Sequence, residues 1–191
     1  MALRANTEER LLDAADELFF SHGIAATPID AVLRRAGVSA ATLYRGFTSK
    51  ESLLAAALDR RHRAWLKTWD EAVATHDTAE GRLLAVFDAL DAFRARPAGS
   101  RWCAFLGSAA EYADAPPELA RALRTESETL RARLAEYAAE VDVARADELA
   151  EQLLLVITGD LAMRLRSPAP TTDTAREIAR ALIASQASAT S

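Results

Sequence analysis

The sequence predicts an all-α protein of about nine helices, and three observations support this fold class. Half of the 191 residues are apolar but only 6% are aromatic, and the chain has just seven glycines and six prolines. Alanine, leucine, arginine and glutamate, which are strong helix formers, dominate the composition. Apolar residues recur at helical spacing, and no segment alternates as a strand would. A chain of this length can bury one large core or two smaller ones.

The first predicted helix runs from Asn6 to about His22. Asn6 followed by Glu9 fits an N-terminal capping box, and the apolar residues between them and His22 form one stripe. Gly23 is placed to end the helix. We expect this helix to support the two that follow.

Residues 27–50 have the pattern of a helix-turn-helix. Thr27 followed by Pro28 predicts an N-cap with proline at the first helical position, and Gly37 supplies the positive φ of a tight turn. Ser39 then caps a second short helix, from Ala40 to about 46. This second helix is the one that such a motif offers to a DNA groove.

The remaining chain is predicted to be helical throughout. Thr48 and Glu51 form a capping box for a fourth helix that extends from about Lys50 to Thr75. Weak breakers after it divide the chain into helices over residues 79–95, 101–113, 117–140, 145–166 and 173–186.

The last two predicted helices are apolar over more of their circumference than one buried face requires. Gly159 and Ala162 place small residues at close-packing spacing within the first of them. We therefore expect a homodimer through these two helices. The alternative, that both apolar faces are buried inside one subunit, stays open.

Charge is distributed unevenly along the chain, although its net value is −5. Residues 27–63 contain seven Lys and Arg against three Asp and Glu, whereas residues 64–191 contain 14 against 20. A basic module on an acidic body is expected where one end of a protein meets phosphate.

Several functional classes are not supported by the sequence. The single Cys103 excludes an internal disulfide, and the chain has no Cys/His cluster with metal-ligand spacing and no glycine-rich phosphate loop. His22, His62 and His76 lie on different elements, so we expect no catalytic site, no metal and no cofactor. Apolar runs such as 153–157 are too short for a membrane span and residues 1–20 lack a signal-peptide core, so a cytoplasmic protein is expected.

Residues 7–58 resemble the TetR family of one-component transcriptional regulators. The resemblance rests on an ordered set of segments: Leu-Phe-Phe-Ser-His-Gly ending the first helix, Thr27, Ala-Gly-Val-Ser at 36–39, Thr-Leu-Tyr at 42–44 with Phe47, and Ser-Lys-Glu at 49–51. A weaker similarity to one subgroup covers 102–105 and 110–112. Two departures stand inside the motif: Ala41 replaces the usual glycine, and Gly46 replaces an aromatic residue or histidine that contacts phosphate.

The resemblance implies a helix-turn-helix DNA-binding domain over residues 1–48 and an effector-binding and dimerisation domain over residues 49–191. It implies a ligand-responsive regulator, usually a repressor, that leaves a palindromic operator in double-stranded DNA when a small molecule binds. The alternative is a helical ligand-binding or scaffold protein with impaired DNA binding, for which Gly46 is the one indication. Expected DNA contacts are Thr27, Ser39, Tyr44 and Lys50 to phosphates, and Ala40, Thr42 and Arg45 to base edges.

The effector is expected in a mostly apolar pocket between helices of the second domain. All three tryptophans of this aromatic-poor chain fall in that part of the sequence. The candidate lining residues are Trp65, Trp69, Phe87, Trp102, Phe105, Tyr112 and Met163, with Glu111 or Asp160 as possible acidic anchors. For each residue alone, ordinary core packing remains the competing interpretation.

Overall fold

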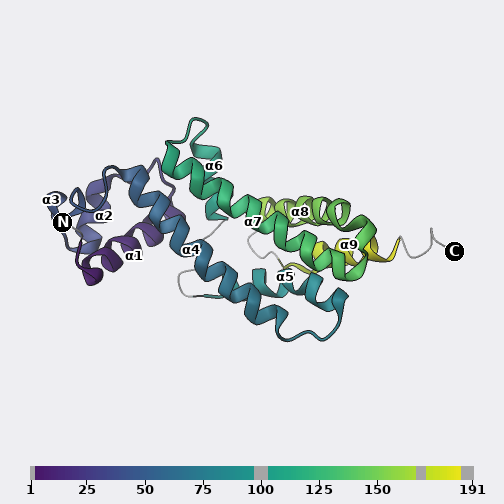
Figure 1. Ribbon diagram of the computed structural model, residues 1–191. Helices are drawn as coiled ribbons and strands as arrows, with labels where there is room; N and C mark the ends of the chain where they lie inside the picture. The colour runs from purple at the N-terminus through teal and green to yellow at the C-terminus, as the bar shows by residue number, and fades with distance from the viewer. Residues whose placement is uncertain (1–2, 97–102, 167–170, 186–191) are drawn as a thin grey trace. The chain divides into compact units, whose positions relative to one another are not determined.

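The computed structural model describes residues 3–96, 103–166 and 171–185, and these residues form helices joined by turns (Figure 1). The all-α prediction is confirmed for them. The helices are α1 (Ala5–His22), α2 (Ile29–Ala36), α3 (Ala40–Leu43), α4 (Lys50–Val73), α5 (Ala79–Arg94), α6 (Ala104–Glu111), α7 (Pro117–Val141), α8 (Ala146–Met163) and α9 (Asp173–Ala184), with a 3-10 helix at Val143–Arg145. Within the described ranges, none of these helices has the length and apolar character that a membrane span requires.

The chain divides into two compact units. The first comprises Met1–His62 and Ser100–Thr125, and the second comprises Arg63–Gly99 and Glu126–Ser191. Helix α4 contributes to both, since its residues up to His62 belong to the first unit and those from Arg63 to the second. The units therefore do not follow the predicted boundary at residue 48, and the division into 1–48 and 49–191 by role stays a prediction.

The core of the first unit joins α1, α2, α3 and the first half of α4 to α6 and the start of α7. Phe19, Leu43 and Leu54 are fully buried in this cluster. Ala104 from α6 and Leu119 from α7 belong to the same cluster. The three N-terminal helices therefore share their core with a later part of the chain.

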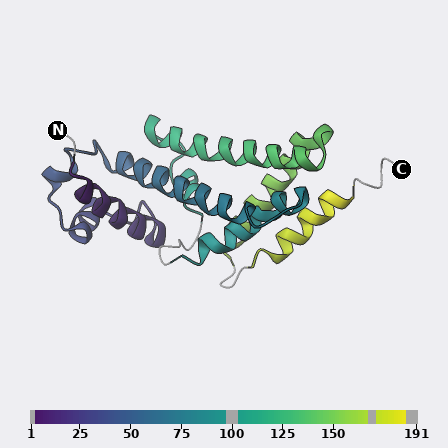
Figure 2. The same cartoon turned by 60° about the horizontal axis from the view of Figure 1, so that its bottom comes forward.

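The core of the second unit is built from the second half of α4 with α5, α7, α8 and α9. Trp69 is fully buried in it, as are Phe87, Leu134 and Leu153 from three other helices. Figure 2 shows α9 beside α5 and α8, with which it makes close contacts.

Three predicted helix caps differ in the structure. Helix α1 begins at Ala5 with Arg4 as N-cap, so Asn6 lies inside the helix and caps nothing. Pro28, not Thr27, is the N-cap of α2 and gives no side-chain hydrogen bond. The capping box of α4 is one residue later than predicted, because Ser49 and Ser52 exchange side-chain-to-amide hydrogen bonds of 3.1 Å.

The turn between α2 and α3 forms as the sequence predicts. Gly37 adopts the left-handed conformation, with φ of 63°, and Ser39 accepts a hydrogen bond from the Thr42 amide at 3.2 Å. The second helix is shorter than predicted: α3 ends at Leu43, and residues up to Phe47 continue as hydrogen-bonded turns.

Candidate DNA-binding interface

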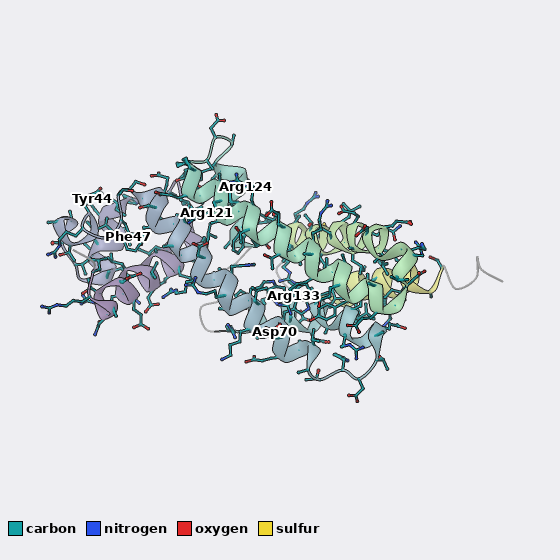
Figure 3. All side chains as sticks on the ribbon, viewed as in Figure 1. Tyr44, Phe47, Asp70, Arg121, Arg124 and Arg133 are labelled. Atoms are coloured by element: carbon teal, nitrogen blue, oxygen red, sulfur yellow. The ribbon has the colours of Figure 1, made fainter. Side chains whose placement is uncertain are left out.

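Two buried side chains fix α3 and the turn after it against the first core. Leu43 is fully buried and Phe47 is 8% exposed, whereas Tyr44 between them is 55% exposed. Figure 3 labels Tyr44 and Phe47, which lie in this segment. Ala40 and Arg45 are also exposed. The segment therefore holds its apolar residues inside and presents the predicted contact residues on the surface.

A row of hydrogen bonds orders the polar side chains of this surface. The hydroxyls of Ser39 and Thr42 lie 2.9 Å apart, and Arg45 donates from Nη2 to Thr42 Oγ1 at 3.1 Å. Ordered side chains lose less conformational entropy when they bind. Ser39, Thr42 and Arg45 are thus brought together in a common, partly preorganised row.

Arg10 from α1 fixes the turn that precedes α3. Its guanidinium donates to the carbonyl of Ala36 and, at 2.7 Å, to that of Gly37. These carbonyls end α2, where a cation is favoured by the helix dipole. The sequence did not indicate this contact, because the partners are 26 and 27 residues apart.

Thr27 and Lys50, both predicted to bind phosphate, are engaged within the first unit. Thr27 is 3% exposed, and its hydroxyl donates to the carbonyls of Gly23 at 2.7 Å and Leu18 at 3.3 Å. Lys50 Nζ donates to the Ile24 carbonyl at 2.5 Å, and partial burial lowers the pKa of this lysine. This geometry favours a role for both side chains in holding the α1–α2 turn over direct phosphate contact.

Glu111 and Tyr112, at the end of α6, also bind parts of the first unit. The Glu111 carboxylate accepts hydrogen bonds from the amides of Ile24, at 3.1 Å, and Ala25, at 2.6 Å. Tyr112 donates to Glu51 at 3.3 Å, and its burial, with the charge of Glu51, raises the pKa of the phenol to about 12. Both predicted effector-pocket residues therefore already have partners in the unit that carries α3.

Two ion pairs join the first half of α4 to α1. Arg61 and Asp16 are 8% and 11% exposed, and one guanidinium nitrogen lies 3.1 Å from both carboxylate oxygens. The more exposed Arg60–Asp13 pair lies at 2.6 Å. These contacts attach this half of α4 to the helix that supports α3.

In the second unit, predicted pocket residues take part in an aromatic cluster. Trp65 and Trp69 have ring centroids 5.6 Å apart, and the guanidinium of Arg133 lies 4.7 Å from the Trp69 ring while pairing with Asp70 (Figure 3). The indole nitrogen of Trp69 is buried and has no hydrogen-bond partner in the described part of the chain. Phe87 is fully buried elsewhere in the same core.

The other predicted pocket residues are dispersed. Phe105 packs on the first core, in the unit that does not contain Trp65. Asp160 pairs with Arg164 at 2.8 Å, and Met163 is 55% exposed at the end of α8. Trp102 lies outside the described residues.

Glu126 on α7 is a half-buried carboxyl that the sequence patterns did not indicate. Its contact is a hydrogen bond from Ser127 at 3.4 Å, and no cation pairs with it among the described residues. Burial raises the pKa of this carboxyl to about 7. Its position could have indicated this, since it lies four residues from both Ala122 and Leu130 on the buried stripe of α7.

Among the described residues, no group of three or more His, Cys, Asp or Glu side chains is placed so that it could hold a metal ion. The arrangement offers a polar, hydrogen-bonded row at the surface of a short helix and the turns that flank it, which buried residues hold in place. Such a surface is suited to binding a nucleic acid groove.

Comparisons with known proteins agree with this geometry. Residues 11–57 match the family described as bacterial regulatory proteins, tetR family. The chain is 34% identical over 95 residues to the uncharacterized HTH-type transcriptional regulator Rv1255c of Mycobacterium tuberculosis, which covers 49% of this chain and 47% of that protein. It is 47% identical over 49 residues to the HTH-type transcriptional repressor ComR of Escherichia coli, covering 26% and 23%. The chain thus spans about half or less of the length of these curated relatives.

The structure is similar over nearly its whole length to SCO4454, a TetR-family transcriptional regulator from Streptomyces coelicolor. The TM-score is 0.80 at 27% identity, over 94% of this chain and 87% of the other. This likeness extends from the helix-turn-helix through the helices that follow it. Residues 11–57 therefore belong to the tetR family of helix-turn-helix bacterial regulatory proteins, a family that is not enzymatic, and the described chain has the fold of a TetR-family transcriptional regulator.

Proposed function

We propose that the chain is a ligand-responsive repressor, which binds a palindromic operator as a homodimer and leaves it when a small molecule binds beyond the helix-turn-helix. The observation that carries the DNA-binding part is the exposed row of Ser39, Thr42 and Arg45 on a segment anchored by Leu43 and Phe47. The repressing sense is supported by the similarity to the transcriptional repressor ComR, whose matching segment covers 26% of this chain.

The homodimer is supported by apolar side chains exposed on the last two helices. Leu155 is 75% exposed and Met163 is 55% exposed on α8, and Ile178 is 47% exposed on α9. A side chain added at Gly159, on the same face of α8 as Leu155, would meet nothing within 4 Å. A second copy of α8 and α9 would cover this face and complete a four-helix interface.

The effector response is supported by the way α4 is shared between the two units. Its first half is paired with α1 through Arg60 and Arg61, and its second half carries Trp65 and Trp69. A ligand among these aromatic side chains would act on the same helix that holds α1. In the proposed mechanism, movement of α4 changes the spacing of the two recognition helices in the dimer, so that they no longer fit half-sites about 34–36 Å apart.

Selection of duplexes from a random-sequence library by the full chain tests this proposal. We expect a palindromic sequence, bound by two chains in sedimentation experiments, with an affinity that falls steeply as salt rises. Tyr44→Ala should weaken binding of that duplex because it removes an exposed aromatic contact beside Arg45, whereas Tyr137→Phe should leave binding unchanged. A chain that selects no sequence would favour the alternative, a helical ligand-binding or scaffold protein.

In the proposed effector pocket the acidic anchor is Glu126, because Glu111 and Asp160 already have partners.

The raised pKa of Glu126 can be tested in the absence of any ligand. The folded state holds this proton up to about pH 7, whereas the unfolded chain loses it near the ordinary glutamate pKa of 4.5, so this carboxyl destabilises the fold increasingly as pH rises through that window.

Glu126→Gln is therefore expected to stabilise the protein relative to wild type more at pH 8 than at pH 5, by up to about 3 kcal/mol. Urea unfolding at the two pH values measures this difference. Glu128→Gln, on an exposed position of the same helix, is the matched control and should show no comparable change with pH. An equal effect of Glu126→Gln on stability at both pH values would contradict the raised pKa of this carboxyl.

A further inference from the structure

Leu3 covers Gly46 at the end of the segment that contains α3. A Cβ atom at position 46 would lie 2.5 Å from Leu3 Cγ and closer still to Cδ1, which is too close for any side chain to be accommodated without moving Leu3. Leu3 is also half-buried against the first core. The glycine therefore leaves the space that the leucine fills, 43 positions earlier in the sequence.

Arg4 follows Leu3 in the sequence, and hydrogen bonds to its main-chain carbonyl hold it in place. It is the N-cap of α1, with φ of −69° and ψ of 138°, and its carbonyl accepts hydrogen bonds from the amides of Thr7, at 2.8 Å, and Glu8, at 3.1 Å. The side chain of Arg4 is exposed. It forms no ion pair or hydrogen bond in the described ranges, although Glu8 stands one helical turn away. Consecutive Cα atoms are about 3.8 Å apart, so this free cation stands next to a residue that contacts Gly46.

We propose that Leu3 fixes the N-terminal segment against Gly46 so that Arg4 binds a phosphate of the operator beside the groove that α3 enters. The inference rests on the DNA binding of the helix-turn-helix and adds a contact from outside it. Arg4 precedes α1, the supporting helix, whereas base edges are within reach of α3 itself. An arginine outside the groove is suited to contact the DNA phosphate backbone, and such a contact adds binding affinity without selecting a base sequence.

The salt dependence of DNA binding tests the phosphate contact. The probe is a labelled duplex selected by the full chain, with a scrambled duplex of the same length beside it, and binding is followed by fluorescence anisotropy between 50 and 200 mM salt. Arg4→Gln should lower the slope of log K against log salt by about 0.9 per chain on both duplexes. The ratio of wild-type to variant affinity should accordingly fall about threefold for each Arg4–phosphate contact as salt rises from 50 to 200 mM.

Arg121→Gln is the matched control, since Arg121 is another exposed arginine of the first unit, placed on α7 (Figure 3). It should retain the wild-type slope. An unchanged slope for Arg4→Gln, or an equal change for Arg121→Gln, would overturn the inference. Wild-type protein that binds neither duplex would instead refute the proposed function.

The contact between Leu3 and Gly46 is tested by a double-variant cycle. Gly46→Ala should displace Leu3 and so reproduce the weaker salt slope of Arg4→Gln. In a Leu3→Ala background the same Gly46→Ala change should cause no further loss, because the leucine that it displaces is gone. An equal loss in both backgrounds would show that Gly46 acts on DNA directly, and would overturn the role given to Leu3. Circular dichroism of each variant confirms that the helices remain folded.

Discussion

Arg45→Ala is expected to lower operator affinity by about 1–3 kcal/mol for each half-site, which is roughly 5-fold to more than 100-fold per recognition segment. The side chain is exposed, carries five N–H donors and is held toward Thr42 by a 3.1 Å hydrogen bond. An arginine in that position can bind guanine through two parallel hydrogen bonds in the major groove. Both half-sites of a homodimer would be affected.

Anisotropy titrations of the selected operator and a scrambled duplex measure the effect. The loss should be larger on the operator than on the scrambled duplex, since base contacts are lost only where the sequence matches. Arg45→Lys is the matched variant, because it keeps the charge but not the forked donor geometry. Relative to Arg45→Ala, it should restore affinity for the scrambled duplex more than affinity for the operator. Equal losses on both duplexes would assign Arg45 to the phosphate backbone.

Asp16→Ala is expected to destabilise the protein by about 3–5 kcal/mol, because it leaves the Arg61 guanidinium inside the fold without its carboxylate. The pair is 8% and 11% exposed, and Arg61 also lies 5.3 Å from the Phe20 ring centroid. Urea unfolding at one fixed protein concentration measures the change, since dimerisation would make stability depend on concentration.

Asp13→Ala supplies the comparison, because the Asp13–Arg60 pair joins the same two helices with side chains that are 66% and 30% exposed. A pair so exposed contributes about 0–1 kcal/mol. Replacing both members of the buried pair, as in Asp16→Leu with Arg61→Met, should recover most of the loss. A cost for Asp16→Ala no larger than that for Asp13→Ala would show that water reaches the pair.

Local patterns were sufficient to predict the helices, because each depends on residues close in sequence. The Ser39 cap, the turn at Gly37 and the apolar spacing of α1 are all signals within a few positions. The family resemblance then identified the residues on the surface of α3. Predicted helix ends lie within a few residues of those in the structure for most of the later helices.

Contacts between side chains and partners distant in the sequence could not be predicted. Lys50 was expected to contact phosphate, and its amine binds the Ile24 carbonyl, 26 residues away. Its phosphate contact stays a prediction, as does that of Thr27, whose expected role as a cap is taken by Pro28. Glu111 was considered as an effector anchor, yet its partners are 86 and 87 residues away. No periodicity in one segment can reveal which other segment will face it. The same limit applies to Gly46, whose neighbour Leu3 lies at the other end of the N-terminal helices.

The contact made by Glu111 has a consequence for how this protein can vary. The carboxylate binds main-chain amides, so the identity of the side chain at Ala25, which is exposed, does not enter into the interaction. Every amino acid except proline supplies the same N–H donor. The surface of the α1–α2 turn can therefore diversify through mutation while its attachment to α6 is inherited unchanged.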